Sequence, residues 1–370
     1  MGSVLEYNPR KLNKYKSDLQ LIASLSGLFS ESETPLIYYR ATENIYCECF
    51  GAANVSRADC TADAVLGNCG IGIKTFVSDN HIQKIAEFNR QRIFYNRLTG
   101  LDLAKAISRL RNERIELTKR LYRLDKLIYH CVVRSPGQID VYEEIMNSID
   151  IDNIVIIQED GRKMVFDDGL EKYEFNFSKS TLYKIFNLID PMFSVPVQII
   201  ENPMDSLRAM AESYRLQGFN RERHYMCSGE TERLIIPLYS TKKGEKFVGE
   251  KSGLNQWNAG GRARDPNEVY IPYPASIRKE CPTFFPNRES KWEMKLPNGE
   301  ILSMKICQQG GKAIMSDPNK DLGKWLLREV LQLRPGEVLT YNKLLEIGID
   351  SVIFTKRFDI YSVDFVTYED

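Results

Sequence analysis

Hydrophobic residues recur at two different spacings along the first half of the chain. Residues 11–29 carry Leu19, Ile22 and Leu25 at helical spacing, which predicts an opening helix, and residues 101–124 repeat that pattern beside a strongly charged face. Residues 80–95 also fit a helix. Short apolar or alternating runs predict strands at residues 36–39, 45–50, 67–76, 127–133, 154–158, 163–166 and 173–177. The first half is therefore expected to be a mixed α/β domain.

The pattern loosens after about residue 187, where prolines stand at positions 191, 196 and 203. A helix is expected at residues 204–218, and beyond it come short strands separated by Gly, Pro and Asn clusters, with one clear helix at residues 322–333. A chain of 370 residues suits about two domains. We expect an α+β protein with an N-terminal domain at 1–190, a linker with a helix at 191–227, and a barrel-like domain at 228–370.

Charge is balanced over the whole chain but not along it. Fifty Lys and Arg residues face fifty Asp and Glu residues, so no global excess indicates a nucleic-acid partner. Local excesses occur at residues 90–126, with eleven basic and four acidic side chains, and at residues 242–264, with six against two. The first of these also fits a solvated helix held by i,i+4 ion pairs such as Glu116 with Arg120.

Two further features limit the class of protein. No apolar run approaches the length that spans a bilayer, and no apolar signal segment follows the N-terminus, so we expect a cytoplasmic, prokaryotic protein without a membrane partner. Eight cysteines include no CxxC pair, which favours reduced thiols. A zinc site is the alternative for the cluster of Cys47, Cys49, Cys60 and Cys69.

The segment 253–274, GLNQWNAGGRARDPNEVYIPYP, is typical of a surface that reads base edges. It holds the amides Asn255, Gln256 and Asn258 and the guanidinium groups of Arg262 and Arg264. Its paired glycines let the backbone approach another surface closely. This composition predicts contact with DNA.

The same segment carries a family resemblance, together with LYSTKKGEK at 238–246, GKWLLREVLQL at 323–333 and EIGIDS at 346–351. Over residues 228–357 the chain resembles the C-terminal DNA-recognition domain of NgoFVII/BfiI-type restriction endonucleases. The resemblance implies a β-pseudobarrel like that of plant transcription factors, which grips the major groove of double-stranded DNA between two arms.

Side-chain chemistry sorts the contacts that this resemblance implies. Lysines suit phosphates, arginines suit guanine, and amides suit adenine. The expected DNA-binding residues are Lys242, Lys243, Lys246, Lys251, Asn255, Gln256, Trp257, Asn258, Arg262, Arg264, Asn267, Lys356 and Arg357. Trp257 is also explained as an anchor of the loop, and Trp325 as a core residue of the helix at 322–333.

The histidines exclude one kind of nuclease. The relatives with this recognition domain use phospholipase-D-like nuclease domains, which need a histidine two residues before a lysine. None of His81, His130 and His224 stands in an HxK sequence. His130, inside LIYHCVV, is better explained as a satisfied core histidine.

A metal-dependent nuclease remains. The N-terminal half resembles PD-(D/E)XK nucleases, with Asp63 on one strand and Lys74 on the next, although Gly72 stands where the second acid is usual. In EcoRII-like and Cfr-type enzymes that acid comes from the following helix, about thirteen residues after the lysine, and Glu87 stands there. We expect Asp63 and Glu87 to hold Mg²⁺, with Lys74 and Gln91 as further catalytic residues. Asp59 is an alternative to Asp63, and Glu48 is a further candidate ligand.

These features together predict a type II-like restriction endonuclease. We expect a homodimer on DNA, and the resemblance implies a cognate DNA methyltransferase encoded separately. One alternative is a catalytically inert, sequence-specific DNA-binding protein whose N-terminal domain mediates dimerisation or partner docking. Another is a domain that reads modified bases while a different subunit cuts.

Overall fold

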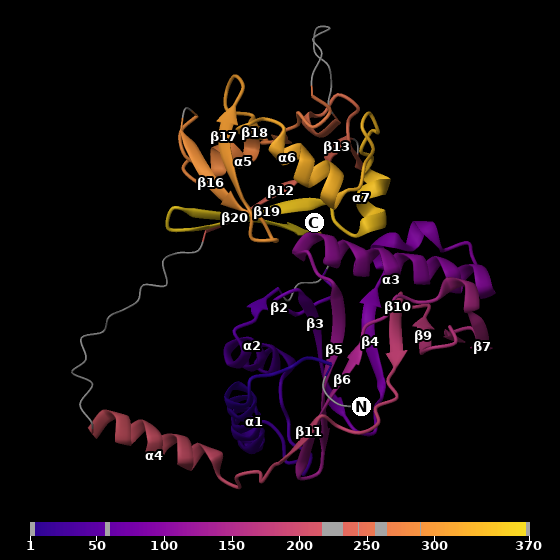
Figure 1. Cartoon of the computed structure of the whole chain (residues 1–370), viewed down its shortest axis with the longest axis vertical. Helices are drawn as coiled ribbons and strands as arrows, with labels where there is room; N and C mark the ends of the chain where they lie inside the picture. The colour runs from indigo at the N-terminus through magenta and orange to yellow at the C-terminus, as the bar shows by residue number, and fades with distance from the viewer. Residues whose placement is uncertain are drawn as a thin grey trace. The chain divides into compact units, whose positions relative to one another are not determined.

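The computed structural model describes residues 4–55, 60–216, 232–242, 244–255, 265–288 and 290–367, with side chains left undescribed at 210–216. The chain forms two compact units, one of residues 1–119 and 124–224 and the other of residues 120–123 and 225–370 (Figure 1). Within the described residues, no helix has both the length and the apolar composition needed to cross a membrane.

The first unit is built on a six-stranded sheet with the order β1-β2-β3-β5-β6-β11. Its members are β1 (Ala53–Asn54), β2 (Ala64–Leu66), β3 (Cys69–Val77), β5 (Lys126–Ser135), β6 (Gln138–Ile145) and β11 (Phe193–Pro196). β3 and β5 pair in parallel, and the other neighbours are antiparallel. Most residues of the two central strands are buried, because both of their faces are covered.

Two helices cover one face of this sheet. α1 (Pro9–Ser24) starts where the Asn8 side chain caps its first turn, and a 3-10 turn, η1 (Leu25–Leu28), continues it. α2 (Tyr39–Phe50) packs beside it, and both bury residues against Ile71 and Ile73 of β3. Successive strand residues point to opposite faces, so Gly72 and Lys74 face the other side.

The opposite side is occupied by α3 (Gly100–Tyr122) and a second sheet. That sheet is antiparallel, in the order β4 (Ile82–Glu87), β10 (Thr181–Ile185), β9 (Lys172–Asn176), β8 (Lys163–Asp167) and β7 (Val155–Glu159). Two 3-10 turns complete the unit, η2 (Asn89–Phe94) and η3 (Ile151–Asn153), and α4 (Pro203–Leu216) follows β11. The side chains that α3 and this sheet bury together include Ile107, Phe166 and Phe175.

The structure confirms the predicted helices at 11–29, 101–124 and 204–218, and the strands that became β3, β5, β7, β8 and β9. Residues 36–39 and 45–50 were wrongly expected to be strands. The short run IYCECF is ambiguous by itself, and its residues Tyr46, Cys49 and Phe50 bury one face of helix α2 instead.

Two other expectations are also wrong. Residues 80–95 form β4 and η2 rather than a helix, because β4 finds an antiparallel partner in β10, about one hundred residues away. Residues 193–196, placed in the linker, are the edge strand β11 and pair with β6. A local pattern does not show such distant partners.

The second unit holds a seven-stranded sheet in the order β12-β19-β20-β16-β17-β18-β15. Its members are β12 (Glu232–Pro237), β19 (Ser351–Arg357), β20 (Ile360–Val366), β16 (Lys291–Lys295), β17 (Ile301–Cys307), β18 (Ala313–Ser316) and β15 (Ile271–Pro272). Only β16 and β20 pair in parallel among these described strands. β13 (Ser240–Lys242) and β14 (Glu245–Phe247) form a separate hairpin.

Short helical segments accompany this sheet: η4 (Gly253–Asn255), α5 (Ala275–Glu280), α6 (Asp321–Gly323) and α7 (Tyr341–Ile347). The helix expected at 322–333 is present as α6 followed by a π-helical segment, η5 (Lys324–Val330). Trp325 is buried on it, with its ring 5.4 Å from that of Phe365, which confirms its expected core role.

Candidate active site and DNA-binding loop

The structure brings Asp63 and Lys74 together. Asp63 directly precedes β2, where its N–H donates to the carbonyl of Ile71 at 2.8 Å. Its Oδ2 accepts from the backbone N–H of Ile73 at 2.7 Å, next to Lys74 in the chain. Burial lowers the pKa of Lys74, and the negative charge of Asp63 partly opposes that shift. A carboxylate thus faces an amine with a weakened hold on its proton.

The position of the missing acid is filled by other groups. A Cβ on Gly72 would lie 2.8 Å from Cε of Met146 and 3.4 Å from Cδ1 of Tyr129. Side chains essentially never pack at the first of these distances. A side chain at this position would have to displace the end of the flexible Met146 side chain, and the acid itself is absent from the sequence.

Glu87 lies on strand β4, not on a helix, so the structural basis of its prediction as a helix-borne ligand is wrong. It is exposed, and its carboxylate pairs with Nζ of Lys84 at 2.5 Å and accepts from Asn89 Nδ2 at 2.7 Å. The bond from Lys84 lowers the pKa of Glu87. This is the geometry of an ordinary surface ion pair.

The other sequence candidates fall elsewhere. Gln91 is buried, and its Oε1 accepts from Arg114 at 3.2 Å. Glu48 is exposed on α2 and pairs with Lys14 at 2.8 Å. Asp59 lies outside the described residues.

Glu43 is a further carboxylate whose charge acts on Lys74, and no sequence pattern singled it out. Its side chain is buried on α2, where it pairs with Nη1 of Arg40 at 2.7 Å, and its charge raises the pKa of Lys74. Next to it, Thr42 accepts a 3.2 Å hydrogen bond from Thr75, the neighbour of Lys74. Reading residues 39–50 as a helix would have placed Glu43 on the buried face with Tyr46 and Phe50.

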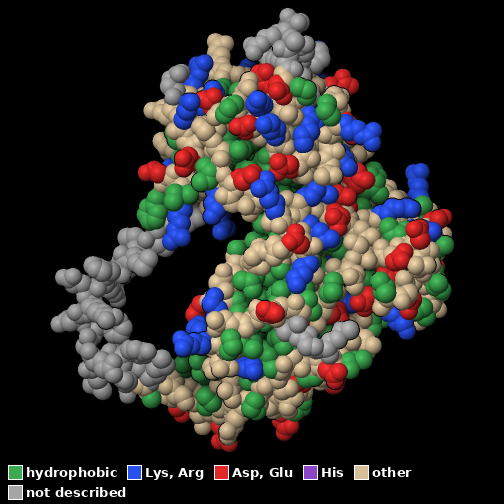
Figure 2. All heavy atoms as spheres, in the orientation of Figure 1, with side chains coloured by type: hydrophobic (Ala, Val, Ile, Leu, Met, Phe, Trp, Pro, Cys, Tyr) green, Lys and Arg blue, Asp and Glu red, His purple; other side chains and the backbone are tan. Residues whose placement is uncertain are grey.

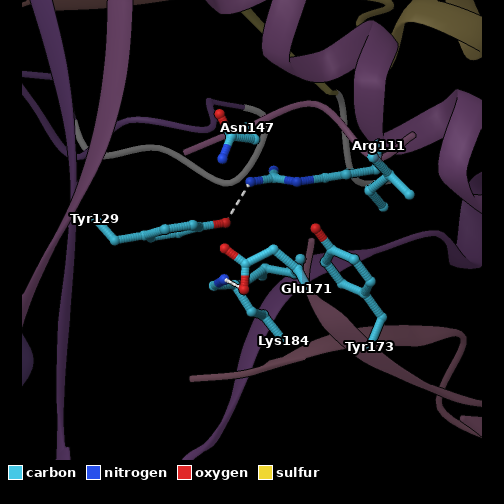
Figure 3. Close-up of a pocket in the computed structure, with 8 residues that line it drawn as sticks. Arg111, Tyr129, Asn147, Glu171, Tyr173 and Lys184 are labelled. Carbon is cyan, nitrogen blue, oxygen red and sulfur yellow. Dashed lines mark hydrogen bonds and ion pairs between the residues drawn. The ribbon is translucent and has the colours of Figure 1, made fainter. Parts of the chain in front are cut away.

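A small polar cavity lies on the Gly72 side of the sheet, lined by Arg111, Tyr129, Asn147, Glu171, Tyr173 and Lys184 together with Ile85 and Ile149 (Figure 3). Its volume of about 10 Å³ is close to the least that one water molecule needs. Arg111 points toward Tyr129 and donates to its hydroxyl at 2.9 Å, and also to Thr61 Oγ1 at 3.2 Å. Thr61 precedes Asp63 by two residues, so this guanidinium positions the turn that carries the candidate carboxylate.

The charges around this cavity compensate one another. Lys184 is buried and pairs with Glu171 and, at 3.1 Å, with Glu144. Burial opposes the charge of Lys184, but the two carboxylates prevail and raise its pKa. No surplus carboxylate is left here for a cation. The described residues contain no group of three or more His, Cys, Asp or Glu side chains arranged to hold a metal ion, so they show no zinc site at Cys47, Cys49, Cys60 and Cys69.

Asp63 and Glu43 offer carboxylate oxygens, the kind of ligand that Mg²⁺ prefers. Mg²⁺ is commonly held by one or two carboxylates together with water and substrate phosphates rather than by an all-protein cage. Asp63 uses one oxygen on the Ile73 amide, and the donor set consists of oxygens alone.

His130 is a core residue, as expected. It is fully buried, with Nε2 3.0 Å from the hydroxyl of Tyr15 and Nδ1 3.1 Å from Glu143. Both ring nitrogens are therefore satisfied within the packing of α1 on the sheet.

In the second unit, the predicted base readers Gln256, Trp257, Asn258, Arg262 and Arg264 lie outside the described residues, as does Lys243. The two ends of that loop are described. At its start, the Asn255 amide donates to the carbonyls of Gly249 and Leu339 at 2.9 and 3.0 Å, and its Oδ1 accepts from the Leu339 N–H at 2.6 Å. Asn255 thus anchors the loop instead of offering its amide to a base.

Arg328 holds the other end of the loop. Its Nε donates to Oδ1 of Asn267 at 2.8 Å, and its Nη2 donates to the carbonyl of Pro266 at 2.6 Å. A third bond joins Nη1 to the carbonyl of Leu333 at 2.7 Å. The π-helical segment η5 orients the guanidinium of Arg328 toward these acceptors, and no sequence pattern predicts that Arg328 makes these bonds.

The remaining basic candidates lie on or near strand ends. Lys242 and Lys251 are exposed, and Lys246 stands over the ring of Tyr239 at 4.8 Å. Lys356 pairs with Glu232 at 3.4 Å, and Arg357 is exposed at the end of β19. Figure 2 shows basic and acidic side chains interspersed over the visible face, in keeping with the zero net charge.

The comparison with known families concerns this second unit. Residues 231–357 match the NgoFVII C-terminal B3-like DNA-binding domain. The match runs from the start of β12 to the end of β19 and includes the segment between the two anchors. It supports binding of double-stranded DNA by this unit. No curated protein matches the chain.

Proposed function

We propose that this protein is a type II-like restriction endonuclease that hydrolyses double-stranded DNA with Mg²⁺. The observation that carries the proposal is the bond of Asp63 to the Ile73 amide, next to a lysine whose pKa burial lowers, in a chain whose other unit matches a restriction-type DNA-binding domain. The order of elements supports a PD-(D/E)XK-like nuclease: helix α2, the antiparallel strands β1 to β3, helix α3, and β5 parallel to β3.

The chemistry follows from the charges. A magnesium ion would supply charge neutralisation at the scissile phosphate and a more acidic water. Asp63 and Glu43 would hold it, and Lys74 would orient the attacking water and take its proton. An amine whose pKa is lowered by burial is better suited to accept a proton near neutral pH than an exposed lysine is.

The proposed magnesium site needs a second carboxylate ligand besides Asp63. We assign it to Glu43, because that residue influences Lys74 electrostatically and lies on the helix bonded to Thr75. Glu87 is the competing choice. We expect Glu43→Gln to abolish cleavage and Glu87→Gln to leave the cleavage rate within a few-fold of wild type. The opposite result would assign the second carboxylate to Glu87.

For the second unit, we propose that Gln256, Asn258, Arg262 and Arg264 read bases, that Lys242, Lys246 and Lys251 bind phosphates, and that Lys356 and Arg357 form a second arm. A homodimer would supply one catalytic centre for each strand. A separately encoded methyltransferase would protect the host's own sites.

The deciding experiment is a cleavage assay on a sequenced plasmid with purified protein and Mg²⁺. Discrete fragments that disappear with Lys74→Ala, but persist with the exposed Lys84→Ala, are the expected result. Specific binding without cleavage in Mg²⁺, Mn²⁺ or Ca²⁺ would sink the nuclease assignment. That outcome would favour an inert DNA-binding protein, a reading supported by the filled position at Gly72.

A further inference from the structure

The segment after β4 has an unusual surface. Residues 88–101, FNRQRIFYNRLTGL, contain three arginines and no acid. Arg92 and Arg97 are exposed, and neither forms an ion pair within the described residues. Between them Ile93 is 67% exposed and Phe94 37%, with Leu98 at 36%. We call Arg92, Ile93, Phe94, Arg97 and Leu98 the arginine ridge.

The arginine ridge is a shaped feature with a fixed base. Phe88, Gln91 and Tyr95 are buried beneath it, and the Tyr95 hydroxyl donates to the carbonyl of Phe88 at 3.0 Å. The carbonyl of Arg92 accepts from the N–H groups of Tyr95 and Asn96, at 3.2 and 2.8 Å. The buried residues thus hold the apolar side chains of Ile93, Phe94 and Leu98 in exposed positions.

The base of the ridge is held by the same stretch of α3 that positions the Asp63 turn. Arg114 stacks over Phe88 and donates to the Glu87 carbonyl at 2.7 Å and to Gln91. One turn to either side, Arg111 donates to Thr61 Oγ1 and Thr118 Oγ1 accepts from the Thr61 N–H at 3.1 Å. Three neighbouring turns of one helix therefore connect the ridge to the candidate carboxylate.

We propose that the arginine ridge is a second DNA-contacting surface, which grips the duplex at the nuclease unit independently of base sequence. Guanidinium groups without acidic partners suit phosphates, and Ile, Phe and Leu beside arginines are the side chains that proteins insert between base steps in the minor groove. The inference rests on the proposed function only in taking DNA as the partner of the whole chain.

Charge argues against a second copy of this chain as the occupant. Two-fold pairing would set the ridge against itself, with Arg92 and Arg97 facing the same side chains of the other copy. Like charges facing one another across an interface oppose association. A polyanion meets no such repulsion.

The test measures binding of the full-length chain to a random-sequence duplex in EDTA at several KCl concentrations. Relative to wild type, Arg92→Ala/Arg97→Ala should make the negative slope of log K against log [salt] shallower by roughly 1.8, the change expected for two lost phosphate contacts. Arg162→Ala, at an exposed arginine on the β7–β8 turn, is the matched control and should leave the slope unchanged. Phe94→Ala should weaken binding without altering the slope.

A slope unchanged in the double variant, or changed equally in Arg162→Ala, overturns the proposal. It is equally overturned if sedimentation without DNA shows that the double variant loses an oligomer that wild type forms, because the ridge would then bind a second copy. The assay contains no metal, so it is independent of cleavage. If the slope changes but the protein never cuts DNA, the arginine ridge is supported and the nuclease assignment is refuted. If the protein cuts DNA but the slope does not change, the nuclease assignment is supported and the arginine ridge is refuted.

Discussion

Asp63 has two separable roles at the scale of single residues, since its carboxylate both bonds the Ile73 amide and faces Lys74. Asp63→Asn keeps an oxygen for the amide and loses the charge, so we expect a stable, inactive protein. Asp63→Ala also leaves the amide without its partner, which should reduce the free energy of unfolding by about 1–3 kcal/mol. Urea unfolding and plasmid cleavage of both variants check this. Equal stability of the two would show that the hydrogen bond matters little.

We expect Lys74 to lower the stability of the folded protein and to be required for cleavage. Burial lowers its pKa in the folded chain, so the unfolded chain binds the proton more tightly. Stability from this group therefore rises with pH, between the lowered folded pKa and the unfolded value of about 10.4. Lys74→Met removes the partly buried charge, so its urea midpoint should exceed that of wild type at pH 7, with the difference shrinking toward pH 10, while cleavage is lost. A midpoint below wild type at pH 7 would contradict this account.

The candidate residues predicted from the sequence lie close to one another in the chain, whereas the one that was not predicted lies far from them. Asp63 and Lys74 are eleven positions apart on neighbouring antiparallel strands, so a turn alone brings them together. The charge of Glu43 acts on Lys74 only because α2 packs on β3, on the face opposite to Lys74. Its segment was expected to be strand and Glu87's to be helix, so the element assignments pointed to Glu87 rather than to Glu43.

On strand β3, neighbouring side chains already occupy the space that the usual motif acid would need at Gly72. Gly72→Glu recreates the usual acid-x-lysine spacing, yet its Cβ meets Met146 at 2.8 Å. We expect the change to destabilise the protein by about 1–3 kcal/mol without raising cleavage. Adding Met146→Ala should recover part of the loss relative to the sum of the two single changes, as measured by urea unfolding. A stable Gly72→Glu variant with enhanced cleavage would refute this reading.

The π-helical segment η5 should control the DNA-binding loop through Arg328. Arg328→Lys cannot form the three separate bonds to Asn267, Pro266 and Leu333. We expect it to lower the preference for the cognate site over random DNA by about tenfold or more while binding to random DNA is kept. Arg334→Ala, at an exposed arginine nearby, is the control. Competition binding measures both, and an unchanged preference in Arg328→Lys would show that the loop needs no such anchor.

For the whole molecule, a dimer with one centre per strand makes a distinct prediction. Wild type mixed with an excess of Lys74→Met protein should convert supercoiled plasmid mainly to nicked circles, because mixed dimers retain one active centre. Wild type alone should give linear DNA, and Lys74→Met alone should give no product. Gel electrophoresis separates the three forms. Linear product that falls only in proportion to dilution, without nicked circles, would indicate that each subunit cuts both strands.

By itself, the sequence determined the long helices, the β3 strand with its lysine, and the DNA-binding character of residues 231–357, because each depends on local periodicity or on a contiguous motif. The tertiary structure alone decided that residues 82–87 are strand and 39–50 helix, that Met146 closes the Gly72 position, and that Arg328 and Asn255 hold the loop ends. Each of these depends on partners far away in the chain, and the free energy of pairing and packing with such partners outweighs local preference.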